Sequence, residues 1–308
     1  MVEWRVRWAC AAMCISFGIF VFACSGGVTS SNGLSSEVRI DIVSTSSILG
    51  DWARQVGGDE VSVIDLIPPG VDPHTFQPGA RDVANIAEAD LVLYVGLNLE
   101  GAWLNDLILN ADVENARVLA LGPLVGTLEA EGEVDPHFWM DPARAKVAVL
   151  AIADELITLD VEHIDVYRGN AAAYVEELEL LDTWSVSTFS DLPLENRTLV
   201  TSHDSLGYFA DRYDFRIVGA VIPGITTERN PSASEMAGLI DAIRESQAKA
   251  IFMEVSTNDR MARRISEETG VPVVDGLKVG TLGAVDSETG TYVTMMRRNV
   301  EIIMEALN

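Results

Sequence analysis

The tripeptide Asp-Pro-His occurs twice in a chain of 308 residues that has only four histidines. The first copy ends at His74 and the second at His137. Proline fixes its own φ and restricts the residue before it, so each imidazole is presented from a stiff turn. Metal sites need such stiffness, because ligand distances must hold to within about 0.2 Å. The repeat therefore predicts two metal ligands.

Two further candidate ligands lie at or just after the ends of predicted strands. His203 follows a predicted strand at 198–201, and Asp275 ends a later predicted strand. Ligands of α/β proteins gather at the carboxyl ends of strands. Three imidazoles and one carboxylate make a four-coordinate set suited to Zn2+. Asp286, in a loop rich in Gly, Ser and Thr, is the alternative to Asp275, whereas His163 opens a long helix and is expected on the surface.

Three acidic residues are expected to support these ligands. Asp72 and Asp135 each lie two residues before a histidine and are predicted to orient its ring. The alternative is that they only form Asp-Pro turns. Glu254 ends a predicted strand and is expected to approach the site, with an ion pair to a neighbouring arginine as its alternative.

Predicted strands and helices alternate on both sides of one long helical stretch. The strands are expected at 38–43, 61–67, 91–95, 118–121, 198–201, 217–222, 250–255 and 271–275. Such alternation favours parallel α/β lobes. The stretch 164–188 is predicted as one helix of about 25 residues and about 37 Å. The fold class is therefore α/β, with two parallel-sheet lobes joined by a long rigid helix and a metal site in the cleft between them. Segment 122–134 is expected to be a loop.

The N-terminus is typical of an export signal. Arginines precede an apolar stretch at 8–23 that is too short to cross a bilayer with confidence. The sequence Val-Phe-Ala-Cys at 21–24 resembles a bacterial lipobox, which predicts cleavage before Cys24 and lipidation of its thiol. The alternative is an uncleaved signal anchor.

These features divide the chain into five predicted segments. Their limits are 1–23 for the lipoprotein signal peptide, 24–37 for a flexible tether, 38–162 for the N-terminal lobe, 163–190 for the linking helix and 191–308 for the C-terminal lobe. The tether is assigned because Ser, Gly and Asn dominate it.

Composition restricts the partners and the chemistry. The formal net charge is −26, which argues against nucleic acid because phosphate binding needs a basic face. All three cysteines lie within the first 24 residues, so the rest of the chain has neither a disulfide nor a thiolate metal site.

The motifs resemble, in the same order, the zinc/manganese solute-binding lipoproteins that feed ABC importers, a metal-receptor family with a helical backbone. The matching segments are 70–78, 135–142, 201–209, 252–254, 273–275 and 291–299, together with the lipobox. The resemblance covers the mature chain. It implies two ligands from each lobe, His74 and His137 from the first and His203 and Asp275 from the second. It also implies a lipid-anchored, extracytoplasmic protein, expected to be a monomer, that delivers its metal to a membrane permease.

The resemblance also bears on the choice of metal. In this family a histidine as third ligand goes with zinc-type members, and a glutamate with many manganese-type members. His203 therefore favours Zn2+, and Mn2+ is the alternative. Many zinc-type members carry a long His-rich loop before the second Asp-Pro-His, whereas the loop 128–134 is short and acidic.

Two rival functions belong to other classes of protein. A secreted zinc hydrolase would use Asp275 as a general base beside a metal-bound water. No His-Glu-x-x-His motif is present, so this enzyme is disfavoured. The second rival is a surface adhesin built on the same fold, whose cell binding would survive loss of the metal ligands.

Overall fold

The computed structural model describes residues 39–111, 116–130 and 132–308. The predicted export signal, the tether and Cys24 lie outside these residues. Among the helices of the described part, none is both long and apolar enough to cross a bilayer.

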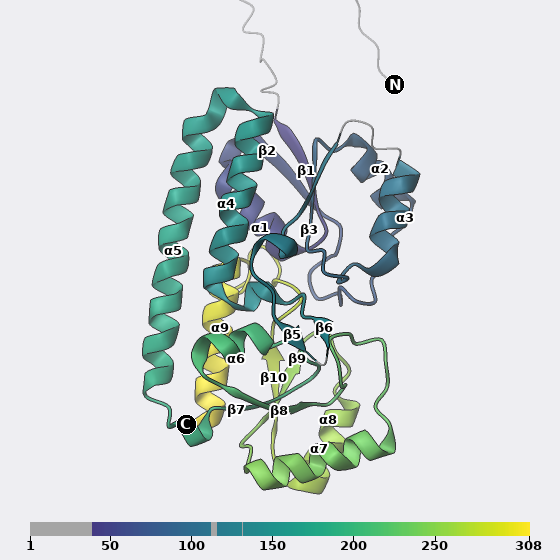
Figure 1. Cartoon of the computed structure of the whole chain (residues 1–308), viewed down its shortest axis with the longest axis vertical. Helices are drawn as coiled ribbons and strands as arrows, with labels where there is room; N and C mark the ends of the chain where they lie inside the picture. Colours follow the sequence, from purple (N-terminus) through teal and green to yellow (C-terminus); the bar gives the residue numbers. More distant parts are fainter. Residues whose placement is uncertain (1–38, 112–115, 131) are drawn as a thin grey trace, which may run out of the picture. The chain divides into compact units, whose positions relative to one another are not determined.

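The first half of the chain forms a four-stranded parallel sheet in the order β2-β1-β3-β4 (Figure 1). Its strands are β1 (Ile40–Ser44), β2 (Val61–Asp65), β3 (Leu91–Tyr94) and β4 (Arg117–Ala120). Its helices are α1 (Ser47–Gly57), α2 (Ala80–Glu88) and α3 (Gly101–Ala111). Alternate strand residues face opposite sides: Ile42 packs in one core with Trp52 of α1, and Val43 packs in another with Ile86 of α2. Both faces of this sheet are therefore covered.

The second half repeats the architecture in a parallel sheet of order β10-β9-β7-β8. Its strands are β7 (Thr198–Thr201), β8 (Arg216–Ala220), β9 (Ile251–Glu254) and β10 (Val273–Leu277). Its helices are α6 (Gly207–Tyr213), α7 (Ala233–Ser246) and α8 (Arg260–Thr269). Met253 packs with Ile243 of α7 and Ile265 of α8, while its neighbour Phe252 faces the opposite core. The predicted class, two parallel α/β lobes, is confirmed.

The helix α5 (Ile164–Ser190) runs alongside both lobes (Figure 1). Its 27 residues span roughly 40 Å at 1.5 Å each. Its buried residues recur every three or four positions along its whole length, as Tyr167, Ala171, Tyr174, Leu178, Leu181, Ser185 and Phe189. The helices α4 (Pro142–Leu159) and α9 (Tyr292–Leu307) pack against it. Residues of both sheets belong to the same hydrophobic core, so opening the lobes widely would expose that core to water.

Short 3-10 helices and one small hairpin lie between the longer elements. The 3-10 helices are η1 (Gly58–Glu60), η2 (Gly122–Leu124), η3 (Phe138–Met140), η4 (Val161–His163) and η5 (Leu194–Asn196). The expected loop 122–134 instead contains an antiparallel hairpin of β5 (Glu129–Ala130) and β6 (Glu133–Val134). Gly132, at φ +88°, supplies the left-handed residue that such a tight connection requires.

Candidate metal centre

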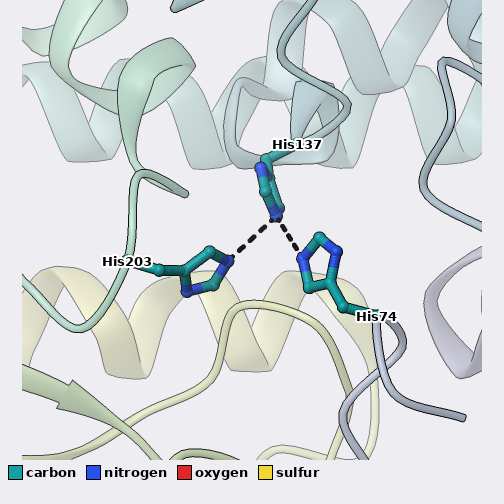
Figure 2. Close-up of side chains that lie close together, drawn as sticks. All are labelled: His74, His137 and His203. Atoms are coloured by element: carbon teal, nitrogen blue, oxygen red, sulfur yellow. Dashed lines mark hydrogen bonds between the residues drawn. The ribbon is translucent and has the colours of Figure 1, made fainter. Parts of the chain in front are cut away.

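Three imidazoles converge between the two sheets. Nε2 of His137 lies 3.3 Å from Nε2 of His74 and 3.3 Å from Nε2 of His203 (Figure 2). A tetrahedral ion with metal–nitrogen bonds of about 2.0–2.1 Å needs its donors roughly 3.3–3.4 Å apart. In the described part of the chain, these residues are the one group of three or more potential ligands whose donor atoms all lie within 4.8 Å of one another. The spacing fits a metal ion.

Each imidazole reaches this point from a different segment. His74 lies in the loop after β2, His137 directly precedes η3, and His203 lies two residues beyond the end of β7. The side chains of His137 and His203 are 1% and 2% exposed, whereas His74 is partly exposed. The site is therefore closed on two sides and borders solvent near His74.

The Asp-Pro-His motif builds the same turn twice. Oδ1 of Asp72 accepts a hydrogen bond from the backbone N–H of His74 at 2.9 Å, and Oδ1 of Asp135 accepts one from that of His137 at 2.9 Å. Such bonds, from an aspartate to the backbone two residues on, stabilise tight turns. Oδ1 of Asp135 also lies 2.8 Å from Nδ1 of the His137 ring. This contact keeps the proton on Nδ1 and leaves the Nε2 lone pair for a metal.

Glu254 is the ion-pair partner of His203, as Asp135 is of His137. Its Oε1 lies 2.8 Å from Nδ1 of His203, at the carboxyl end of β9. The same oxygen accepts hydrogen bonds from the hydroxyls of Ser202 and Ser205, the latter at 2.9 Å. Neither serine was predicted as a site residue, because the only signal was its closeness to His203 in the chain. Together they fix the carboxylate that orients the ring.

The surroundings shift the pKa values of His74 and His203 in opposite directions. Burial, with His137 and His203 nearby, lowers the pKa of His74 to about 2. Burial also opposes the charged form of His203, but the Glu254 carboxylate outweighs it and raises the pKa of His203 above its ordinary value. Burial works in turn to raise the pKa of Glu254, yet the charge of His203 prevails and lowers it to about 2. His74 is thus kept neutral, whereas below the raised pKa of His203 a metal must displace a proton from that ring.

Asp275 does not join the three imidazoles, contrary to the sequence-based expectation of a fourth ligand. Its side chain is 56% exposed and bonds to Arg263 of α8 at 3.2 Å. The expected strand end was wrong: β10 continues to Leu277, with an irregular register after Asp275 and φ of +108° at Gly276. Asp275 therefore lies within an edge strand rather than at its carboxyl end. The alternative residue, Asp286, is exposed in its loop and is also outside the cluster.

Hydroxyl groups of the second lobe hold both Asp-Pro-His turns. Oδ2 of Asp72 accepts a hydrogen bond at 2.5 Å from Oγ1 of Thr227, in the loop between β8 and α7. The hydroxyl of Tyr208 on α6 donates to the backbone carbonyl of Asp135 at 2.8 Å. Neither contact was foreseen from the sequence. Both connect a metal-binding turn directly to the opposite lobe.

A cavity of about 430 Å³ adjoins the exposed side of the cluster. His74, Phe76 and Pro136 are among the residues that line it. Two carboxylates, Glu133 of β6 and Glu228 of the loop that carries Thr227, also line it. This cavity gives a cation a path to His74 past acidic side chains.

Comparison with known proteins places the chain in a family. The family described as "Zinc-uptake complex component A periplasmic" matches residues 42–306. The manganese ABC transporter substrate-binding lipoprotein PsaA of Streptococcus pneumoniae is 32% identical over 301 residues, with 95% of each chain covered. The manganese-binding lipoprotein MntA of Bacillus subtilis is 33% identical over 295 residues, with 93% of this chain and 95% of MntA covered.

Solved structures agree with this relationship. The periplasmic zinc-binding protein TroA of Treponema pallidum superimposes with a TM-score of 0.82 at 28% identity, covering 87% of this chain and 99% of TroA. A manganese-bound periplasmic metal-binding protein of Candidatus Liberibacter asiaticus gives a TM-score of 0.79 at 26% identity, covering 88% and 100%. The family consists of receptors that serve a membrane permease, not of enzymes. The chain therefore belongs to the family of metal-binding substrate-binding proteins of ABC transporters.

Proposed function

We propose that this protein captures Zn2+ outside the cytoplasmic membrane and delivers it to the permease of an ABC importer. The observation that carries the choice of zinc is the donor set. His74, His137 and His203 offer three imidazole nitrogens, and no carboxylate of the described residues joins them. Imidazole suits zinc, whereas manganese favours carboxylate, carbonyl and water oxygens.

Charge balance supports the same proposal. Neutral imidazoles bring no negative charge to the ion, but two buried carboxylates stand directly behind them. Asp135 contacts the ring of His137, and Glu254 contacts the ring of His203. Their two negative charges offset the two positive charges of a divalent ion, which lowers the cost of burying it.

Manganese is the second candidate, and the relatives supply the reason. PsaA and MntA are both named as manganese proteins, while TroA is named as a zinc protein. A manganese ion bound by the same three imidazoles would have to complete its coordination with oxygen donors from elsewhere.

Metal competition tests the proposal. The purified full chain is stripped of metal and dialysed against equal concentrations of Zn2+ and Mn2+, and bound metal is counted by mass spectrometry. We expect one zinc per chain, lost in His203→Ala and kept in the matched control His163→Ala. His163 lies on η4, where it bonds to Asp160 outside the cluster. Preferential manganese would overturn the zinc assignment, and no bound metal would overturn the receptor role.

The anchor is a separate part of the proposal. We propose that Cys24 is lipidated after signal cleavage, so that the protein stays attached to the outer face of the membrane and acts there as a monomer. The lipobox and the naming of PsaA and MntA as lipoproteins support this. A mass measurement on the membrane fraction should show the lipid on the wild-type protein. The variant Cys24→Ser should lack this lipid mass. An unmodified Cys24 in the wild type would contradict it.

A further inference from the structure

We infer that one coordination position of the bound ion is filled from solution through the cavity beside His74, not by a side chain of the residues that the structure describes. This inference rests on the proposed zinc-receptor function. Zinc takes four donors in closed protein sites, and sites with three protein ligands complete the set with water or another external molecule. Within residues 39–111, 116–130 and 132–308, three side chains converge and no fourth potential ligand lies with them.

The geometry leaves one direction of approach. Behind His137 stands Asp135, and behind His203 stands Glu254, each at 2.8 Å from a ring nitrogen that points away from the cluster. Both imidazoles are almost fully buried. His74 is partly exposed and lines the cavity of about 430 Å³, so an external donor reaches the ion beside His74.

Glu100, the buried carboxylate that lines this cavity, already accepts hydrogen bonds from other groups. Oε1 of Glu100 accepts hydrogen bonds from Oγ1 of Thr45 and the backbone N–H of Val95, both at 2.8 Å. Its Oε2 accepts one from the N–H of Gly96 at 3.0 Å. Turning Glu100 toward the metal would break all three bonds and leave buried donors unpaired. Glu100 is therefore excluded as the fourth donor.

The remaining carboxylates would have to leave water to reach the ion. Glu133 and Glu228 are exposed at the rim of the cavity. Because Asp135 and Glu254 already offset the charge of the ion, a further carboxylate would add an uncompensated negative charge to the buried site. A neutral water molecule adds none. The structure thus assigns the fourth position to water, which small monodentate donors can replace.

Cobalt serves as a spectroscopic substitute, because the visible spectrum of Co2+ responds to each of its donors. The full chain is loaded with Co2+ and titrated with pyridine, a small, neutral, monodentate nitrogen donor. The same titration is run on Glu133→Gln, Glu228→Gln and Asp275→Asn. Each variant keeps the shape of the side chain but removes the charged donor.

Each outcome separates the inference from the function on which it rests. We expect pyridine to shift the cobalt bands in a saturable way, and the pyridine-free spectra of the three variants to match the wild type. A spectrum that does not respond to pyridine would overturn the inference while leaving the receptor intact. A variant whose pyridine-free spectrum differs would identify that carboxylate as the fourth donor. Failure to bind Co2+ at all would instead count against the proposed function.

Discussion

The two Asp-Pro-His turns share one tripeptide and one backbone hydrogen bond, yet they serve the site differently. Asp135 is 1% exposed and holds the ring of His137 as well as its backbone. Asp72 holds only the backbone of His74, and its second oxygen reaches Thr227 in the other lobe. The local sequence sets the turn, whereas the packing around it decides what the second contact of each aspartate does. The turn at 135–137 is buried, whereas Asp72 and His74 of the other turn are partly exposed.

The largest expected difference comes from removing the ligands themselves. His137→Ala takes away the nitrogen that lies 3.3 Å from both others, so we expect zinc affinity to fall by more than ~100-fold. His74→Ala removes the imidazole at the edge of the cluster and should cost less than His137→Ala. Competition with a fluorescent zinc chelator measures both, with His163→Ala as the control. Wild-type affinity in His137→Ala would refute the assignment of this site.

The next largest difference in zinc affinity is expected between variants of Asp135 and of Asp72. Asp135→Ala removes the partner of a ligating ring, and such partners contribute about 10–100-fold in metal affinity. Asp72→Ala removes only a backbone contact and the bond to Thr227, so we expect a loss below about tenfold. The same chelator competition measures this. An Asp72→Ala loss larger than that of Asp135→Ala would show that the two turns have been assigned the wrong way round.

His74 and His203 should contribute differently to the pH dependence of zinc affinity. The pKa of His74 is about 2, so this ring stays neutral and adds no pH dependence near neutrality. The pKa of His203 is raised, so below it zinc must displace a proton and affinity should fall about tenfold per pH unit. Above that pKa the affinity levels off.

Glu254→Gln sharpens this test. Without the carboxylate the pKa of His203 falls, and zinc affinity should level off at a lower pH than in the wild type. The contribution of His203 to the stability of the metal-free protein changes with pH in the opposite direction. A raised pKa stabilises the fold below the unfolded value, and this contribution disappears as pH rises through the folded pKa. Thermal unfolding and zinc titrations across the same pH series check both, and an unchanged profile in Glu254→Gln would contradict the role of Glu254.

The smallest expected effect concerns the contacts between the lobes. Thr227→Val removes the hydroxyl that bonds Asp72, a bond contributing roughly 0.5–1.5 kcal/mol. Zinc release into excess chelator should speed up by about 2–10-fold. Tyr208→Phe removes the matching bond to the backbone of Asp135 and should lower the melting temperature more than it changes release. Faster release in Tyr208→Phe than in Thr227→Val would reverse the comparison.

Local patterns predicted most of the elements. The helix expected at 164–188 is observed at Ile164–Ser190, because its apolar residues recur at helical spacing. The stiffness of the Asp-Pro-His turns was also readable, since it depends on proline and on a bond spanning two residues.

Contacts across long stretches of sequence were not readable. Thr227 donates a hydrogen bond to Asp72 across 155 residues of sequence, and Ser202 donates one to Glu254 across 52. No local pattern predicts either contact. The end of β10 was misplaced by two residues, since Gly276 allows the strand to continue past Asp275 through an irregular register. Asp275 therefore lies within β10 and apart from the three imidazoles.

X-ray absorption at the zinc edge shows directly whether three imidazoles hold the zinc ion. The full chain is loaded with one equivalent of Zn2+ and compared with His203→Ala. We expect three imidazole donors at about 2.0–2.1 Å in the wild type and a loss of one of them in the variant. A wild-type spectrum with two or fewer imidazoles, or one unchanged by His203→Ala, would contradict it.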